Sequence, residues 1–307
     1  MLARSFALAL LLEVAFFVGL AVHGFDASPA TAGAFALAGV LVLRALLIGV
    51  IYALARRWSA AVPHLSLGQR LRMVLAEYAA HVLTFVVIFP LERWWMAPDR
   101  LRSAAPQGDP QRRTPVLLVH GYCCSRASWW WLRRRLETAG WTVATITLEP
   151  VYAAIDSYVE PLAHRIDAVL DETGASQLVL VGHSMGGLVA RAYLQRFGDA
   201  RVKRLITLGT PHQGSRLAEL GLGENGRQMR PGSRWLESLA WPPAKVGPLV
   251  IYSPHDEFVT PQHLLRLPLG KHEEIAGLGH LAMLYSPRVW LALQQGLEQT
   301  VCDDRPG

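Results

Sequence analysis

Long apolar runs fill the first ninety residues of the chain, and shorter apolar runs recur through the rest. Residues 5–22 (SFALALLLEVAFFVGLAV) and 34–55 (AFALAGVLVLRALLIGVIYALA) can each cross a bilayer core, because a helix rises about 1.5 Å per residue and the core is about 30 Å thick. The link between them contains Pro29 and Gly33, which are typical of a turn. The pattern therefore predicts a helical hairpin in a membrane.

Each of these two predicted spans carries one charged residue near its middle, Glu13 in the first and Arg44 in the second. A lone charge at this depth is energetically costly. The two residues lie at similar distances along the chain from Ser28 in the turn, so antiparallel helices place them at similar depth. We expect Glu13 and Arg44 to pair; the alternative is that each faces a protein cavity separately.

A third apolar stretch, residues 73–90 (MVLAEYAAHVLTFVVIFP), either spans the membrane or lies along its surface as an amphipathic helix. It contains Glu77 and His81, one helical turn apart. Two ligands do not make a metal site, so we expect a hydrogen bond on one helix face. Residues 1–92 are thus predicted to form an N-terminal membrane region.

The orientation of this region follows from its basic residues. The loop between the first two spans lacks Lys and Arg, whereas several arginines follow the second span, namely Arg56, Arg57, Arg70 and Arg72. The positive-inside rule then places both ends of the hairpin in the cytoplasm. The remainder of the chain is cytoplasmic if residues 73–90 do not span, and lies on the outer face if they do.

Strand-like and helix-like segments alternate in the second part of the chain. Residues 93–114, rich in Pro, Gly and charge, predict a linker. Short apolar runs then predict strands at 115–119, 142–148, 178–181, 204–208, 248–252 and 273–276. Helical patterns separate them at 128–139, 156–172 and 186–197, and a last helix is predicted at 287–299. Residues 115–300 are therefore predicted to be an α/β domain with a mainly parallel sheet and helices on both faces.

The sequence Gly182-His183-Ser184-Met185-Gly186 matches the pattern G-x-S-x-G. The string alone is a weak signal, but here it follows the predicted strand LVLV and begins a predicted helix. That strand–turn–helix context is the elbow that presents a nucleophilic serine. The turn also places the Ser184 hydroxyl at a helix N-terminus, where developing negative charge is favoured.

A nucleophilic serine needs a base, and with this elbow the acid and then the histidine follow it along the chain. Asp256 and His280 each come directly after a predicted strand, where parallel sheets place their chemistry. Glu257 is an alternative to Asp256 as the acid, and we favour Asp256. Three other histidines are rivals to His280: His255, His263 and His272. His255 abuts the acid, and His272 is predicted to precede its strand.

The negative oxygen formed during acyl transfer needs two fixed N–H donors. The backbone of Met185, directly after the serine, is one candidate. The other is expected in the loop after residues 115–119, and the amide of Tyr122 fits best. His120 in the same loop is expected to shape the loop and not to take part in catalysis.

Several of these segments together resemble bacterial lipases and esterases of the α/β-hydrolase superfamily over roughly residues 115–295. The matching pieces are VLLVHGY, LVGHSMGGLVARAYLQ, RLITLGTPHQGS, SPHDEFV and GLGHLAML. The resemblance implies an α/β-hydrolase fold, hydrolysis of a carboxylic ester through an acyl-enzyme, a triad of Ser184, Asp256 and His280, and oxyanion donors at Tyr122 and Met185. Leu281 and Ala282 follow His280 where some secreted relatives have an aspartate that binds calcium, so no metal is expected.

Two further features of the predicted domain allow alternative interpretations. Residues 214–247 form either a small lid over a lipid-binding cleft or a surface loop without a gating role. Trp129, Trp130 and Trp131 are consecutive and face different directions, so we expect some of them to be ordinary helix–sheet packing, although they could line an acyl pocket or touch the membrane.

Composition narrows the function further. The chain is 51% hydrophobic and 18% charged with a net charge of +6, and its arginines flank apolar spans, which favours lipid headgroups over nucleic acid. Its three cysteines predict neither a disulfide framework nor a metal site, and no cofactor is expected. We predict a membrane-anchored ester hydrolase, located in the bacterial inner membrane, acting on apolar acyl esters. An acyltransferase using the same acyl-enzyme and an inactive membrane scaffold are the alternatives.

Overall fold

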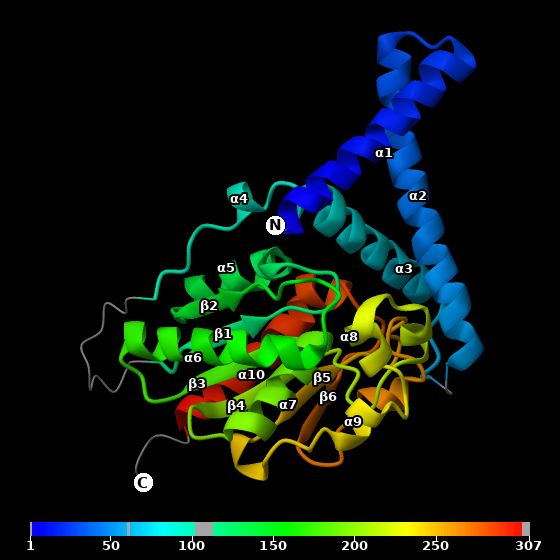
Figure 1. The fold of residues 1–307 in the computed structure, drawn as a ribbon. Helices are drawn as coiled ribbons and strands as arrows, with labels where there is room; N and C mark the ends of the chain where they lie inside the picture. The colour runs from blue at the N-terminus through cyan, green and yellow to red at the C-terminus, as the bar shows by residue number, and fades with distance from the viewer. Residues whose placement is uncertain (1, 60–61, 102–112, 303–307) are drawn as a thin grey trace.

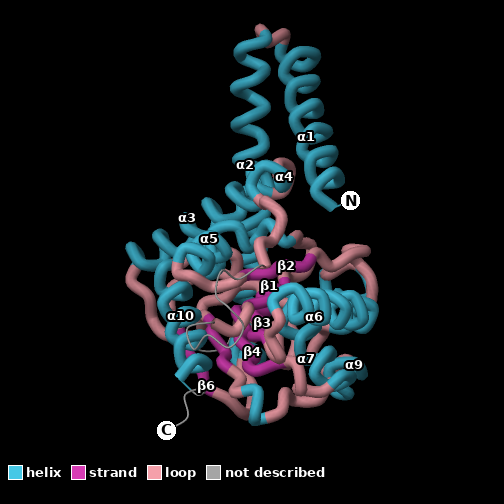
Figure 2. Tube along the Cα trace, turned by 90° about the vertical axis from the view of Figure 1, so that its left-hand side faces the viewer, coloured by secondary structure: helices cyan, strands magenta, loops and turns pink. Residues whose placement is uncertain are grey.

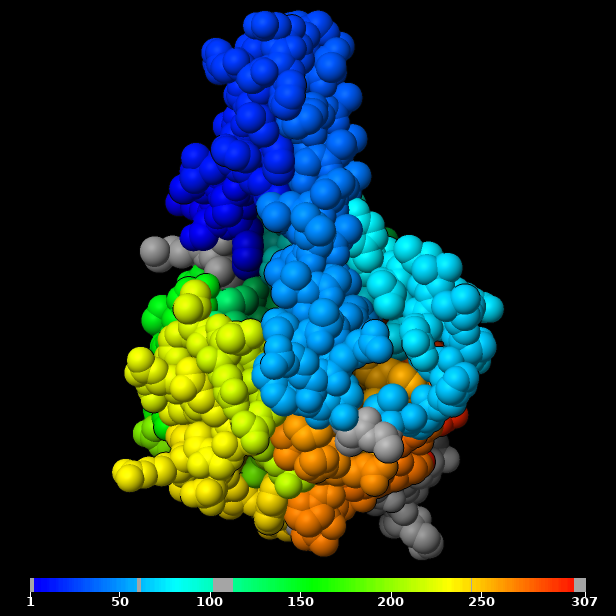
Figure 3. Space-filling view, turned by 90° about the vertical axis from the view of Figure 1, so that its right-hand side faces the viewer, coloured from blue at the N-terminus to red at the C-terminus, as the bar shows by residue number. Residues whose placement is uncertain are grey.

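A helical hairpin stands on a layered α/β body in the computed structural model, which describes residues 2–59, 62–101 and 113–302 (Figure 1). Half of the predicted linker, residues 102–112, lies outside the described part of the chain. The hairpin helices project from the body, and a third long helix lies across it (Figures 1 and 2). Space-filling shows the second half of the second helix running down the face of the body (Figure 3).

The body is built on a six-stranded, fully parallel sheet with the strand order β2-β1-β3-β4-β5-β6. The strands are β1 (Val116–Val119), β2 (Val143–Ile146), β3 (Leu178–His183), β4 (Val202–Leu208), β5 (Leu249–Tyr252) and β6 (Lys271–Glu274). Each coincides with a predicted strand to within a few residues. The largest difference is at β6, an edge strand of sequence KHEE, because its half-exposed polar residues carry no apolar signal.

Helices cover both faces of the sheet, as predicted. The helices of the body are α5 (Trp130–Thr138), α6 (Val159–Thr173), α7 (Met185–Phe197), α8 (Gly223–Gln228), α9 (Arg234–Ser238) and α10 (Pro287–Cys302). Successive strand residues point to opposite faces, so Leu117 belongs to the core under α6 and α7. Leu118 belongs to the core under α5 and α10. The fold is therefore a three-layer α/β sandwich.

The hairpin consists of α1 (Leu2–Phe25) and α2 (Pro29–Trp58), and Ser28 caps α2 by accepting a hydrogen bond from the Thr31 amide. Arg44 donates to both carboxylate oxygens of Glu13, at 2.9 and 2.6 Å. The predicted Glu13–Arg44 pair is thus confirmed. At about 1.5 Å per residue, α2 is about 45 Å long, which exceeds a bilayer core of about 30 Å. Its last turns are therefore available to contact the body.

The third apolar stretch is α3 (Leu67–Val82) followed by a π-helix (Leu83–Ile88), and it packs against the body. Glu77 is fully buried, and its carboxylate accepts the amides of Leu281 and Ala282 at 3.1 and 2.8 Å. The sequence predicted His81 as its partner, which is wrong because backbone amides of the body bind both carboxylate oxygens of Glu77. His81 lies against the Phe85 ring, with centroids 4.6 Å apart.

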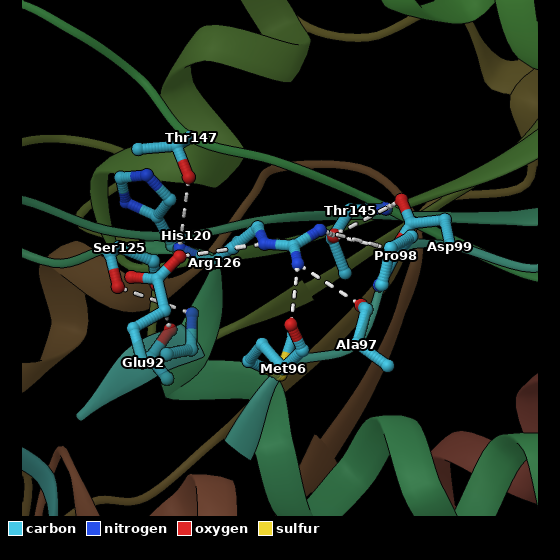
Figure 4. Close-up of polar contacts among 12 residues, drawn as sticks. Glu92, Met96, Ala97, Pro98, Asp99, His120, Ser125, Arg126, Thr145 and Thr147 are labelled. Atoms are coloured by element: carbon cyan, nitrogen blue, oxygen red, sulfur yellow. Dashed lines mark hydrogen bonds and ion pairs between the residues drawn. The ribbon is translucent and has the colours of Figure 1, made fainter. Parts of the chain in front are cut away.

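Beyond the short helix α4 (Glu92–Trp95), the chain is tied to the body by partly buried charged side chains (Figure 4). Arg126 donates to the carbonyl oxygens of Met96 and Ala97, both at 3.0 Å. Asp99 accepts the amide of Thr145 in β2 at 2.7 Å and forms ion pairs with Arg126, Arg133 and Arg165. Residues 96–99, within the predicted linker, are therefore docked on the sheet.

Candidate active site

Ser184 sits on a sharp turn between β3 and α7, as the motif predicted. Its backbone has φ +54° and ψ −128°, which is rarely populated by a residue with a side chain. A Cβ at Gly186 would collide with the carbonyl oxygen of Val119, and one at Gly182 with the backbone of Gly187. The two motif glycines are therefore required by close backbone approach, which holds the strained turn in place.

Asp256 and His280 come together beyond the ends of β5 and β6. The His280 Nδ1 and the Asp256 Oδ2 are 2.7 Å apart, and both side chains are buried. The other oxygen of Asp256 accepts the amides of Phe258 and Val259 at 2.9 Å each. Ser184 and His280 line one cavity. The fold thus gathers the three residues of the expected triad at the carboxyl ends of the strands.

The neighbouring carboxyl group, Glu257, points elsewhere. Its two oxygens accept a hydrogen bond from the backbone amide of His280, at 3.2 and 3.3 Å. The His280 ring is bound instead by Asp256. Of the rival histidines, His255 is bound through its ring to the carbonyl of Pro63 and the amide of Gly277. His272 lies inside β6, not before its strand as predicted, and its Nε2 accepts the Leu267 amide.

The electrostatic setting favours a basic His280 beside neutral histidines. Burial lowers the pKa of the His280 imidazole, but the Asp256 carboxylate outweighs it, so the pKa is raised above 6.5. His183, whose Nε2 lies 3.3 Å from the His280 carbonyl oxygen, has its pKa held well below 6.5 by burial. His280 is thus the histidine in this cluster whose surroundings favour taking up a proton.

The loop after β1 closes on the serine from the other side. A Cβ at Gly121 would lie 2.8 Å from the Ser184 Cβ, so no side chain fits there. His120 bonds through Nδ1 to the Gly121 carbonyl and through Nε2 to the Leu148 amide, at 2.8 and 2.9 Å. Burial lowers its pKa to about 4. The predicted loop-shaping role of His120 is confirmed. Tyr122 lines the same cavity as Ser184, and Met185 directly follows Ser184 in the chain.

Comparison with known proteins bears on the fold of the body. A family profile described as alpha/beta hydrolase fold matches residues 114–232. A triacylglycerol lipase of Pseudarthrobacter phenanthrenivorans is 32% identical over 115 residues, or 35% of this chain and 36% of that protein. The chain therefore matches about a third of the length of this curated relative.

Two solved structures share the fold at low sequence identity. The mature lipase of Bacillus licheniformis matches with a TM-score of 0.54 and 18% identity, over 63% of this chain and 96% of that one. Aspergillus fumigatus lipase B matches with a TM-score of 0.59 and 14% identity, over 93% of this chain and 85% of that one. The body of the chain has the α/β-hydrolase fold.

The cavity at Ser184 lies between the α/β-hydrolase body and the N-terminal helices. It has a volume of about 470 Å³, and the helices supply part of its wall, namely Phe6, Leu10, Leu47, Ile51 and Phe85. The sequence missed this contribution. A helix that is apolar on all sides gives no contrast between the side that faces lipid and the side that faces protein.

A second cavity of about 350 Å³ also reaches Ser184. It shares Leu47 and Ile51 with the first cavity and is otherwise lined largely by the segment after β4, including Leu217 and Met229. This segment is the lid candidate at residues 214–247, which forms a 3-10 helix (Arg216–Leu220) and the helices α8 and α9. Part of it therefore forms a wall of the site, and a gating role stays a prediction.

The three consecutive tryptophans serve in packing. Trp129 is fully buried in the hydrolase core, and Trp130 meets Trp95 edge to face with ring centroids 5.3 Å apart. The guanidinium of Arg135 lies 4.4 Å from the Trp131 ring centroid. The expectation of ordinary helix–sheet packing is confirmed for Trp129, and the other two rings contact neighbouring side chains.

Proposed function

We propose that the chain is a membrane-anchored serine hydrolase that cleaves apolar carboxylic esters. The observation that carries this proposal is one cavity lined by both Ser184, on its strained elbow, and His280, whose Nδ1 is bound to Asp256. The α/β-hydrolase fold and the lipase names of its relatives support the same reaction class. The largely apolar side chains around the cavity suit an acyl chain.

In the proposed reaction, the Ser184 Oγ attacks the ester carbonyl while His280 Nε2 takes its proton. Asp256 holds the Nδ1 proton and stabilises the imidazolium. The amides of Met185 and Tyr122 donate to the oxyanion. Collapse of the intermediate breaks the ester bond, and His280 returns the proton to the departing alcohol. Water then attacks the acyl-enzyme by the same route and releases the acid and free Ser184.

The anchor in this proposal is the α1–α2 hairpin. Three helices are long and apolar enough to cross a membrane by length and composition. Because α3 packs on the hydrolase body, we propose that the chain crosses twice and that the body is cytoplasmic, on the side of Arg56 and Arg57. Alkaline phosphatase fused to the C-terminus should then be inactive in cells, and an active fusion would place the body on the outer face.

An acyltransferase is the second candidate, favoured by the second cavity that meets Ser184. An acceptor alcohol bound there would attack the acyl-enzyme in place of water. Adding a primary alcohol to the assay separates the two activities, because a transferase forms a new ester while a hydrolase still releases free acid.

Labelling with a fluorophosphonate tests the nucleophile directly, because the probe reacts with an activated serine. The wild type should be labelled and Ser184→Ala should not. Ser157→Ala serves as a control at an exposed serine outside the site. An unlabelled wild type would favour the scaffold alternative, and labelling that persists in Ser184→Ala would refute the assignment of Ser184.

A further inference from the structure

A pair of buried carboxyl groups lies behind the catalytic histidine. Glu77 comes from α3 and Glu257 follows Asp256, and both are almost completely buried, with exposures of 0% and 1%. The charge of Glu77 acts on Glu257, so the two carboxyl groups lie close enough to interact. Together they hold three consecutive backbone amides of the loop that carries His280: those of His280, Leu281 and Ala282.

We propose that Glu77 and Glu257 form an acid–carboxylate pair that positions His280, which makes α3 a support of the active site. This inference rests on the proposed function, because it assigns the pair a role in that reaction. Glu77 acts through the loop backbone and not through substrate, since the two carboxyl groups are absent from the wall of the cavity at Ser184 as far as the described residues show. Both are therefore positioning residues.

The pair holds one proton, because two carboxylates in contact in a buried site cannot both ionise. The hydrogen bonds identify its location. Burial raises the pKa of Glu77, but Glu77 also accepts two amides, one at each oxygen, which favours its ionised form. Burial, and then the charge of Glu77, raise the pKa of Glu257 well above its usual range. Glu257 is thus the acid, donating to Glu77 while it accepts the amide of His280.

The loop is shaped for this contact. Gly279 precedes His280, and a Cβ at this position would collide with the Glu77 carboxylate. Glycine therefore lets the carboxylate approach the loop backbone. A carboxylate that only fixed α3 to the body would have no need to contact the residues on each side of the catalytic imidazole.

The two carboxyl groups respond differently to the same isosteric change. In Glu257→Gln, the amide still donates to Glu77 and still accepts the His280 amide, so kcat should stay within about threefold of wild type. In Glu77→Gln, one side-chain atom becomes a donor facing a backbone N–H, which displaces the loop. Misplacing a catalytic group by about 1 Å costs on the order of 100-fold, so kcat should fall by a factor of that order.

The experiment measures kcat and KM for a p-nitrophenyl ester with the full chain in detergent, normalised to active sites by fluorophosphonate titration. Glu77→Gln should lower kcat with KM within about twofold, Glu257→Gln should be close to wild type, and Glu257→Leu should resemble Glu77→Gln. A structural tether instead predicts a lower melting temperature with unchanged kcat per folded site. Equal loss in both Gln variants, or full kcat in Glu77→Gln, would overturn the proposal.

Should Glu77→Gln fail to fold, Glu257→Gln alone still decides, because a large loss of kcat in that variant contradicts a protonated Glu257. Gly279→Ala provides a further check and should reproduce the kcat loss of Glu77→Gln. The proposed function fails separately: a wild-type protein that neither hydrolyses the ester nor takes the probe would refute it before any variant is compared.

Discussion

The hairpin α1–α2 and the α/β-hydrolase body differ in how their charged groups are paired. Within the hairpin, Glu13 and Arg44 neutralise each other, and their side chains are each 14% exposed. Within the body, Asp256 is fully buried and holds the ring of His280, an arrangement that leaves the second ring nitrogen for chemistry. Under the proposed function, the hairpin pair lowers the free-energy cost of membrane insertion, whereas the Asp256 carboxylate raises the pKa of the proposed base, His280.

The helix α3 belongs with the body in this comparison, although its sequence resembles the hairpin. All three long helices pass the length and hydropathy requirements for a span, yet the buried share of the most apolar window rises from 6% in α1 and 17% in α2 to 33% in α3 with its π-helical extension. The binding partner of the carboxylate on each helix distinguishes α3 from the hairpin helices. Glu13 binds Arg44 within the hairpin, whereas Glu77 binds backbone amides of the α/β body.

The largest expected effect comes from Asp256, and it tests whether the chemistry lies in the body. In Asp256→Asn the imidazole loses the carboxylate that fixes its tautomer, so kcat should fall by about 10³- to 10⁴-fold. Without that charge the pKa of His280 should also fall. Activity is lost as the pH drops through this pKa, so the acid limb of kcat/KM should move to lower pH. The measurement is a pH profile of ester hydrolysis.

Asp171→Asn is the matched control, because it removes a carboxylate of the same kind from an exposed site on α6. It should leave both kcat and the pH profile unchanged. If Asp256→Asn retained more than about a tenth of the wild-type kcat, a different carboxyl group would have to serve as the acid.

Sequence alone predicts the hydrolase body well, because buried parallel strands appear as continuous apolar runs. It also indicates Ser184, since the elbow is a local feature of adjacent residues. Asp256 and Glu257 are adjacent carboxylates, and no local pattern encodes which of the two side chains points to the His280 ring, so the sequence favoured Asp256 but left Glu257 as an alternative. The Glu77 contact joins residues 204 positions apart on either side of a linker, and no periodicity carries that information.

The next effect concerns the hairpin. Glu13→Leu leaves the Arg44 guanidinium without its carboxylate in an apolar setting, which should destabilise the inserted hairpin by about 3 kcal/mol. The double variant Glu13→Leu/Arg44→Leu removes both charges and should restore stability. Melting temperature in detergent and the membrane-integrated fraction of the expressed protein provide the two measurements.

The double variant also isolates the pairwise interaction from the effects of each side chain alone. If the loss of stability in the double variant equalled the sum of the losses in the two single variants, the two charges would be solvated separately. Probe labelling of the folded fraction of Glu13→Leu should match wild type, since Glu13, unlike Arg44, is not among the described residues that line the cavity at Ser184.

The smallest expected effect tests whether the hairpin helix α2, together with the body, contacts the substrate. Ile51 on α2 lines both cavities at Ser184, so Ile51→Trp should fill space that a long acyl group needs. We expect kcat/KM for a long-chain p-nitrophenyl ester to fall by about 10-fold relative to the acetate ester. Val42→Trp, at a 56% exposed position on the same helix, is the control and should leave the ratio unchanged. An equal loss on both esters would mean that α2 supports the body without selecting the substrate, and an unchanged ratio would separate the anchor from the active site.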